Sequence, residues 1–340
     1  MSVAVIIALL LGAADASAAV GAQINGGGAP VPYPVYSRWL SDYRKLHPDV
    51  EITYQSIGSG AGIRGLLAGA LFFAGTDGPM TREQMQAMPG GVLHFPTLLH
   101  AVVPIYNLPD NPELRFSGRT LADIVLGRVT KWDDSAIAVE NPGVRLPAAD
   151  IKPILQLDGS GTTYILIDYL AKVAPDFKAR VGIQTAITWP VNYVSHKSSE
   201  GVAGQVRALP GAIGFLEFSY ALANKMQCGM VRNFDGEFVR ASTTSLTAAG
   251  AAATPYIRTT AADYRVSITN APGRGAYAMA SFSWLVLPRV PTDRRKARAM
   301  AAFLEWALTD GQDTTVDLGY APLPAELRAL ECEALHATYP

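Results

Sequence analysis

The stretch VEITYQSIGSGAGIRGLL, residues 50–67, contains the signals of a strand, a turn and a helix in that order. Residues 50–54 alternate apolar and polar side chains, which is typical of a half-buried strand. The small residues 58–62 then form a turn, and Ile63, Leu66 and Leu67 continue at helical spacing. In this arrangement backbone N–H groups and a helix N-terminus converge, so the stretch predicts an anion-binding turn.

The same order recurs about 100 residues later. Residues 151–157 are strand-like, residues 158–163 (DGSGTT) form a polar turn, and residues 164–173 are an apolar helical run. Strands and helices alternate from Ile24 onward, which predicts an α/β fold with mostly parallel sheets. We expect one anion-binding turn in each of two domains.

Length and composition agree with two globular domains. The chain has 340 residues, 49% of them apolar and 17% charged, and single cores stop growing at about 250–300 residues. The formal charge is −1, from 28 basic and 29 acidic residues without blocks of like charge. A nucleic-acid partner is therefore excluded, and any anion must be bound by local dipoles and a few side chains.

Three further segments predict a core helix, a crossing between lobes and a strand. Residues 35–47 carry an aromatic stripe that includes Tyr36, Trp39 and Tyr43 at helical spacing, which favours a core helix ending before Pro48. The Pro- and Asn-rich segment 107–119 suggests a crossing between lobes, and residues 281–287 are strand-like.

The N-terminus predicts export. An apolar run of about 14 residues is too short for a membrane span, which needs about 20, and Ala16-Ser17-Ala18 follows as a cleavage site. Residues 1–18 are thus expected to be a signal peptide, although no Lys or Arg precedes the run; the alternative is a buried strand or helix. The expected location is periplasmic or secreted.

The two cysteines, Cys228 and Cys332, lie outside any C-x-x-C pair, so zinc and thioredoxin-type chemistry have no support. In an oxidising compartment they could form a disulfide that closes a long loop. Two buried free thiols are the alternative.

Enzymatic motifs are weak or missing. Gly60–Gly65 matches the dinucleotide pattern G-x-G-x-x-G, but the acidic residue at the expected distance, Glu83, follows a turn. Ser59 and Ser160 lie in tight turns, yet neither belongs to a G-x-S-x-G elbow. A Walker A loop, H-E-x-x-H and an EF-hand loop are all missing from the sequence. We therefore predict a protein that is not an enzyme, with no catalytic residue, cofactor or metal.

Several motifs together resemble one family, the periplasmic phosphate-binding proteins that feed ABC-type phosphate importers. The residues that carry the resemblance occur in the family's order along nearly the whole chain after residue 18: INGGGAPVPYP (24–34), YQSIGSGAGI (54–63), GTDGPM (75–80), KWDD (131–134), DGSGTT (158–163), LPGAIG (209–214) and GYAPLP (319–324).

The resemblance implies a two-lobed, type II periplasmic-binding-protein fold with the ligand in the cleft between the lobes. Lobe 1 is expected to comprise residues 24–107 plus 270–340, and lobe 2 residues 108–269. The implied protein is a monomer without a cofactor that captures inorganic phosphate by hinge closure and presents it to a membrane ABC importer permease.

The resemblance also implies ligand-binding residues. Ser59 would donate its hydroxyl, and Ser160, Gly161 and Thr162 would hold the oxyanion at a helix N-terminus. Val31 would contribute a backbone N–H group.

Asp77 is the implied acceptor of the ligand's proton. A carboxylate repels an anion unless the ligand carries a proton to donate, which monohydrogen phosphate has and sulfate lacks. Asp77 therefore favours phosphate or arsenate over sulfate. The alternative is that Asp77 caps a helix at residues 81–88.

Two positions depart from the family pattern. Pro30 and Val31 replace the usual Thr and Phe, and Gln156 takes the place of an arginine, which also leaves Asp158 without its implied partner. A lost charge-assisted hydrogen bond costs about 1.5–3 kcal/mol. Weaker phosphate binding, another cationic donor or a larger phosphorylated ligand would each fit, as would a serine-dependent hydrolase or an adhesion module on the same fold.

Overall fold

The computed structural model describes residues 22–156, 160–183, 189–196, 198–259 and 264–340. The predicted signal peptide and the predicted turn residue Asp158 lie outside these segments. The strands are β1 (Ala22–Gly28), β2 (Val50–Ser56), β3 (Phe73–Thr76), β4 (Val92–Tyr106), β5 (Arg115–Phe116), β6 (Lys152–Gln156), β7 (Val194–His196), β8 (Ala212–Glu217), β9 (Met230–Arg232), β10 (Phe238–Val239) and β11 (Ala280–Pro288).

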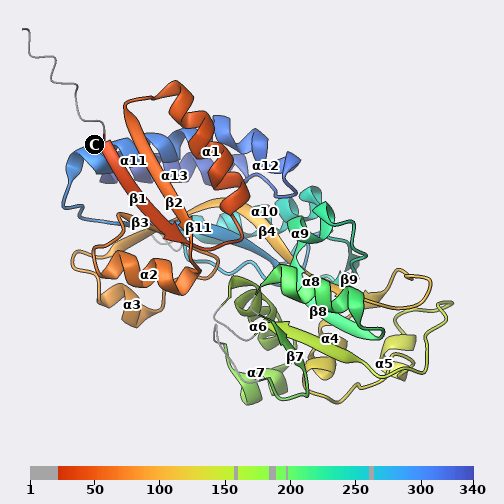
Figure 1. The fold of residues 1–340 in the computed structure, drawn as a ribbon. Coiled ribbons are helices and arrows are strands. Elements are labelled where there is room, and N and C mark those ends of the chain that lie inside the picture. The colour runs from red at the N-terminus through yellow and green to blue at the C-terminus, as the bar shows by residue number, and fades with distance from the viewer. Residues whose placement is uncertain (1–21, 157–159, 184–188, 197, 260–263) are drawn as a thin grey trace, which may run out of the picture.

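The helices lie between these strands and after the last of them (Figure 1). They are α1 (Tyr33–Leu46), α2 (Ser59–Leu67), α3 (Arg82–Gln86), α4 (Gly118–Val125), α5 (Ser135–Ala138), α6 (Gly161–Val173), α7 (Pro175–Val181), α8 (Ser199–Ala208), α9 (Phe218–Ala223), α10 (Thr243–Thr259), α11 (Arg294–Leu308), α12 (Asp313–Asp317) and α13 (Ala325–Thr338), with a short 3-10 turn at Asp310–Gln312.

The main sheet has the strand order β2-β1-β3-β11-β4-β8-β6-β7, and β10-β9-β5 form a small separate sheet. The outer strand pairs of the main sheet are parallel, as the sequence predicts. The centre differs, because β11 pairs antiparallel with β3 and β4, and β4 pairs antiparallel with β8. The α/β class is confirmed, with an antiparallel centre that the alternation did not indicate.

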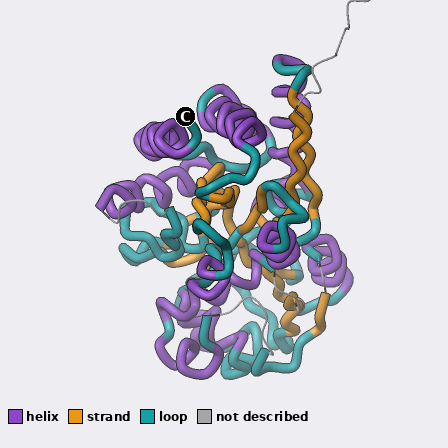
Figure 2. The backbone as a smooth tube through the Cα atoms, turned by 90° about the vertical axis from the view of Figure 1, so that its left-hand side faces the viewer, coloured by secondary structure: helices purple, strands orange, loops and turns teal. Residues whose placement is uncertain are grey.

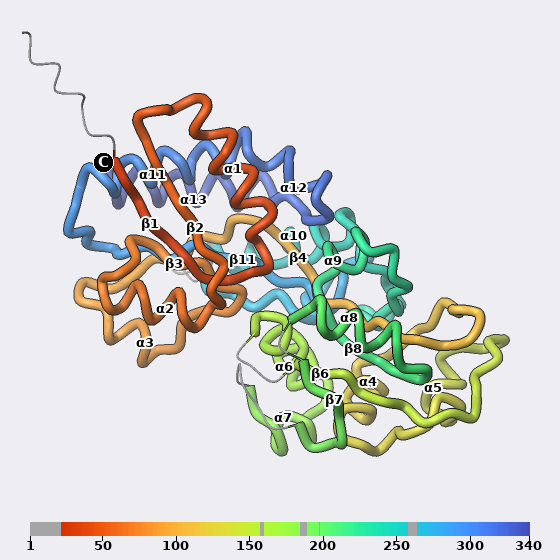
Figure 3. The backbone as a smooth tube through the Cα atoms, in the orientation of Figure 1, coloured from red at the N-terminus to blue at the C-terminus, as the bar shows by residue number. Residues whose placement is uncertain are grey.

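Strand β4 joins the two halves of the molecule. Its residues 92–101 pair with β11, and its residues 102–106 pair with β8. We call the half around β1, β2, β3 and β11 the first lobe, and the half around β6, β7 and β8 the second lobe. Figure 3 shows the N-terminal and C-terminal segments together in the first lobe. The segment 107–119 follows β4 and reaches the small sheet through β5; the predicted residue bounds of the lobes stay a prediction.

Helices cover both faces of the first lobe. Helices α1, α11 and α13 lie on one side of its strands, and α2 and α3 lie on the other (Figure 1). The view turned by 90° shows helices outside the strands in both lobes (Figure 2). The parallel strand β3 is buried along its whole length, whereas the outer strands β2 and β7 are mostly half-buried or exposed.

The aromatic stripe of α1 is part of the core. Tyr36, Trp39 and Tyr43 are buried, which confirms the prediction for these side chains, whereas Leu46 is 61% exposed. The Trp39 indole N–H donates to the carbonyl of Gly311 at 2.6 Å. The first helix is thereby fixed to the C-terminal part of the chain.

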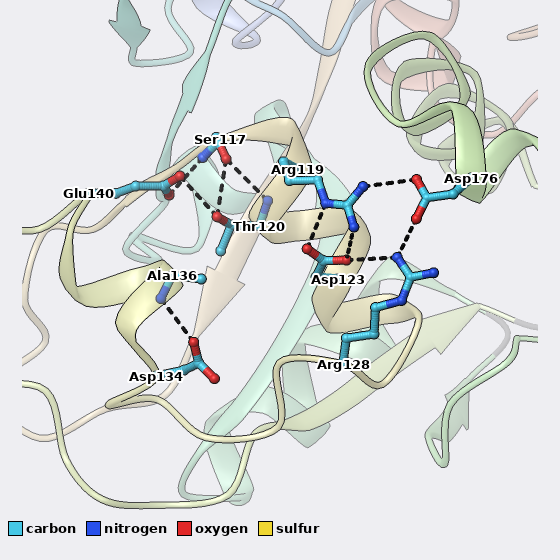
Figure 4. Close-up of polar contacts among 9 residues, drawn as sticks. All are labelled: Ser117, Arg119, Thr120, Asp123, Arg128, Asp134, Ala136, Glu140 and Asp176. Carbon is cyan, nitrogen blue, oxygen red and sulfur yellow. Dashed lines mark hydrogen bonds and ion pairs between the residues drawn. The ribbon is translucent and has the colours of Figure 1, made fainter.

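Two sequence motifs meet in the second lobe. Trp132 is fully buried, and its indole N–H donates to the Gly211 carbonyl at 3.0 Å, so the segment 131–134 contacts the segment 209–214. Asp134 caps α5, because its carboxylate accepts from the Ala136 N–H at 2.9 Å (Figure 4).

An ion-pair network ties α4 to α7 on the surface of the second lobe. Arg119 binds Asp123 through two N–H groups, at 2.7 and 2.9 Å, and reaches Asp176 at 2.9 Å. Arg128 contacts the same two carboxylates (Figure 4). The network therefore links α4 and α7, two helices that both pack against α6.

Cys228 and Cys332 are free thiols, so the disulfide alternative is not realised in this structure. Burial raises the pKa of both, that of Cys228 to about 12. Within the described residues, every helix is too short or too polar to cross a membrane.

Candidate functional site

The N-terminus of α6 forms one wall of the site. Ser160 caps the helix, and its Oγ accepts from the Thr163 N–H at 3.1 Å. Gly161 and Thr162 occupy the first turn, where backbone N–H groups have no carbonyl of their own helix to bind. Both residues are buried within a helix of 13 residues. This end of the helix can therefore bind an anion through N–H groups and the helix dipole.

Asp77 approaches that helix end from the first lobe. It follows β3 directly and is completely buried. Its Oδ1 accepts from the Ser283 hydroxyl at 2.5 Å, while its Oδ2 has no hydrogen-bond partner. A methyl group at Gly161 would lie 2.3 Å from Asp77 Cβ and 2.7 Å from Oδ2, so only glycine fits there. The unpartnered oxygen thus faces the α6 N-terminus.

Burial controls the charge of Asp77. Desolvation raises its pKa from 3.8 to about 7, the Ser283 hydrogen bond lowers it, and the charge of Glu217 raises it further. The carboxyl group is therefore part protonated at neutral pH, ready to exchange a hydrogen bond with a ligand that carries acidic protons.

Asp77 does not cap a helix. The N-cap of α3 is Thr81, whose side chain and that of Gln84 form a capping box. The helix begins at Arg82, and Asp77 lies four residues before the cap. The capping alternative for Asp77 is therefore wrong.

Ser59 lies beside Asp77. It is the first residue of α2, and its Oγ accepts from the Asp77 N–H at 3.3 Å. Because the oxygen accepts there, the hydroxyl hydrogen is available to a ligand. The two predicted first-lobe side chains are thus brought together at the loop that faces Gly161.

A buried imidazole lies behind Asp77. His100 Nε2 is 3.7 Å from Asp77 Oδ1 and 3.2 Å from the carbonyl of Phe282. Burial lowers the pKa of His100 to about 4, so the ring is neutral at pH 7. His100 therefore does not balance the charge of an ionised Asp77.

A cleft of about 580 Å³ extends from the α6 N-terminus between the lobes. Five of the predicted residues line it: Val31, Gln156, Ser160, Gly161 and Thr162. Ser59 and Asp77 are not among the lining residues and lie behind Gly161. Residues of the first lobe close the other side, including Asp317 and Tyr320.

Val31 is fixed by the last motif of the chain. It is buried in the cleft wall, and its carbonyl accepts from the Tyr320 hydroxyl at 2.6 Å. The segment 319–324 therefore holds the loop of residues 24–34 in place.

Gln156 ends β6 and is buried below the α6 turn. Its backbone carbonyl accepts from the Trp189 indole at 3.1 Å, and its Oε1 accepts the Ser160 hydroxyl. Among the described residues that line the cleft, none is Lys, Arg or His. The described lining thus contains no cation that replaces the family's arginine.

Sequence reasoning missed Glu217, the last residue of β8. Its Oε1 accepts the Thr162 hydroxyl and its Oε2 accepts the Ser199 hydroxyl, and it lines the same cleft. The signal was an acidic residue at the end of an apolar run directly after the 209–214 motif. Its closeness to Thr162 depends on β8 lying beside β6, which the sequence pattern did not specify.

The other ligand classes considered from the sequence lose their support here. Glu83 lies exposed in the first turn of α3 and not at a strand end, where a dinucleotide site needs its acidic residue. Ser59 contacts Asp77, and Ser160 contacts Gln156 and Thr163, so within the described chain neither hydroxyl is bonded to a histidine base.

Comparison with known proteins agrees with the fold. A family model described as a PBP superfamily domain matches residues 13–311. A phosphate-binding protein from Stenotrophomonas maltophilia has the same fold, with a TM-score of 0.69 and 16% identity over 92% of this chain and 93% of that one. A putative phosphate ABC transporter substrate-binding protein from Clostridium perfringens, solved with bound phosphate, gives 0.63 and 19% over 89% and 100%. The architecture is that of the two-lobed periplasmic binding proteins.

Sequence relatives identify the family more closely. The phosphate-binding protein PstS of Xylella fastidiosa is 38% identical over 308 residues, which cover 90% of this chain and 82% of the relative. PstS of Haemophilus influenzae is 35% identical over 307 residues, covering 90% of each. The chain belongs to the PstS family of phosphate-binding proteins.

Proposed function

We propose that this protein binds inorganic phosphate in the cleft between its lobes and delivers it to a membrane ABC importer permease. One observation carries the proposal: the buried Asp77 carboxyl has an unpartnered oxygen that faces the N-terminus of α6. A bound anion receives hydrogen bonds from the helix end and must return one to Asp77. Phosphate and arsenate can do so, whereas sulfate carries no proton at neutral pH.

The ligand contacts come from both lobes in this proposal. Backbone N–H groups of Gly161 and Thr162 bind two oxygens, Ser59 donates its hydroxyl, and the backbone N–H of Val31 donates from the opposite loop. The Gln156 amide takes the place that a guanidinium has in the resembling family, with less charge. Because the two walls belong to different lobes, the ligand stabilises their closure.

The predicted lobe bounds, the monomeric state and the export of the chain after removal of residues 1–18 belong to the same proposal. Family membership supports a binding protein rather than an enzyme. Hydrolysis of a chromogenic phosphate or acyl ester that disappears in Ser160→Ala would contradict that part.

Calorimetric titration tests the ligand. The purified protein without its first 18 residues should release or absorb heat with phosphate and arsenate and give no signal with sulfate at pH 7.5. Asp77→Ala should weaken phosphate binding by about 10- to 150-fold, as expected for a lost charge-assisted hydrogen bond. Sulfate binding as tight as phosphate binding would contradict the role of Asp77.

One observation favours a second candidate, a phosphate monoester. The cleft volume of about 580 Å³ leaves room beside a single tetrahedral anion. Competition between glycerol phosphate and inorganic phosphate in the same calorimeter separates the two: the ester should displace phosphate only if its substituent fits the cleft.

A further inference from the structure

The hydroxyl hydrogens at the α6 N-terminus point into the protein. Thr162 donates to Glu217 Oε1, and Ser160 donates to Gln156 Oε1, with Thr163 Oγ1 as an additional acceptor at 3.1 Å. A hydroxyl has one hydrogen and two acceptor lone pairs. With their hydrogens so engaged, both side chains offer the ligand lone pairs instead of O–H donors.

The charged side chains around the cleft also favour a ligand that carries more protons and less negative charge. Three carboxylates line it, Glu200, Glu217 and Asp317, while its described lining contains no Lys, Arg or His. Glu217 is 9% exposed, so solvent screens its charge poorly. A dianion in this cleft is opposed by like charge, and a ligand with one negative charge less is opposed less.

The groups that face Glu217 do not offset its negative charge. Thr162 of α6 and Ser199 of α8 are neutral donors. Asp77, beyond β3, adds negative charge when ionised. Tyr320, after α12, stays neutral because burial and the charges of Glu217 and Asp77 raise its pKa. Asp317 of α12 and Glu200 of α8 share the lining.

We propose that Glu217 is a specificity-determining residue which, by holding the Thr162 hydroxyl hydrogen, makes the cleft select phosphate as the doubly protonated monoanion H₂PO₄⁻. This inference rests on the proposed function. One phosphate hydrogen donates to Asp77 Oδ2, and the other donates to the lone pairs of Thr162 or Ser160. Above neutral pH the free ligand is HPO₄²⁻, so the complex takes one proton from the solvent for each phosphate bound.

The number of protons taken up tests the inference on the unmodified protein. Phosphate is titrated at about pH 8.5, where the free ligand is the dianion and Asp77 is ionised, in buffers with different ionisation enthalpies. The slope of observed heat against buffer enthalpy gives the protons bound. We expect one proton to be taken up per phosphate bound. The affinity for phosphate should fall about tenfold for each pH unit above about pH 8.5. Binding with no proton uptake overturns the inference and leaves the proposed function intact.

Variants test the part played by Glu217. Glu217→Met removes the charge and both carboxylate acceptors, which frees the Thr162 hydroxyl to donate to the ligand. Proton uptake at pH 8.5 should therefore fall toward zero, and phosphate should bind about tenfold tighter there, with little change at pH 6. Glu200→Met is the matched control, since it removes an exposed carboxylate of the same cleft that holds neither hydroxyl. Unchanged proton uptake in Glu217→Met would overturn the assignment to this residue. Failure of the unmodified protein to bind phosphate at any pH would instead contradict the proposed function.

Discussion

Replacing Asp77 with Asn should stabilise the ligand-free protein, and more so as the pH rises. Burial raises the pKa of this carboxyl from 3.8 to about 7, which corresponds to roughly 4 kcal/mol between the two protonation states. The folded protein therefore has its full stability below pH 4, where Asp77 is protonated in both states, and loses stability as the pH rises through 7. Asn keeps an acceptor for Ser283 and cannot ionise, so the variant does not lose this stability.

Urea unfolding measured between pH 5 and pH 8.5 gives the difference. The free energy of unfolding of Asp77→Asn minus that of the unmodified protein should grow by about 2–3 kcal/mol over this range. Asp133→Asn, an exposed aspartate of the second lobe, is the control and should give a constant difference. A constant difference for Asp77→Asn as well would show that the buried carboxyl is solvated or paired, and would refute the reasoning.

Three further outcomes follow from the site and its support. Gln156→Arg should tighten phosphate binding about 10- to 150-fold by calorimetry, and no change would mean that a cation already serves the ligand. Gly161→Ala should weaken phosphate binding in the calorimeter by about 1–3 kcal/mol, because the new methyl group overlaps Asp77 when the lobes are closed. Gly204→Ala is the control: its Cβ lies in open space, so this variant should bind phosphate normally. Trp132→Phe should lower the free energy of unfolding by about 1–3 kcal/mol through the lost bond to Gly211 and leave the phosphate Kd unchanged.

Local sequence signals were sufficient where a feature is made by neighbouring residues. The turn and helix at Ser59 and the capped helix at Ser160 are each encoded within about 15 residues, and the sequence located both. The burial of Trp39 follows from helical periodicity in the same way. Family resemblance supplied what spacing does not, namely that these two turns come together at one site, where Ser59 contacts Asp77 and Asp77 lies against Gly161.

Contacts between distant segments could not be predicted from local patterns. The environment of Asp77 comes from Ser283 on β11 and Gly161 on α6, and β11 enters the sheet antiparallel between β3 and β4. The hydrogen bond from Thr162 to Glu217 likewise joins residues 55 positions apart. An apolar run specifies neither the order of the strands nor their register. The contact between Glu217 and Thr162 could therefore be identified only from the structure.

The lack of an arginine at position 156 and the raised pKa of Asp77 are connected through electrostatics. A guanidinium near the cleft would favour the ionised carboxylate and lower its pKa. Here burial raises the pKa of Asp77, the Ser283 hydrogen bond offsets part of that rise, and the charge of Glu217 adds to it. A buried site can offset the charge of an anion with a cation or with a proton. The described lining contains no Lys, Arg or His, and in the proposal above a proton held between Asp77 and the ligand provides this offset. Affinity in this protein should therefore follow pH more than ionic strength, since salt screens buried charges weakly.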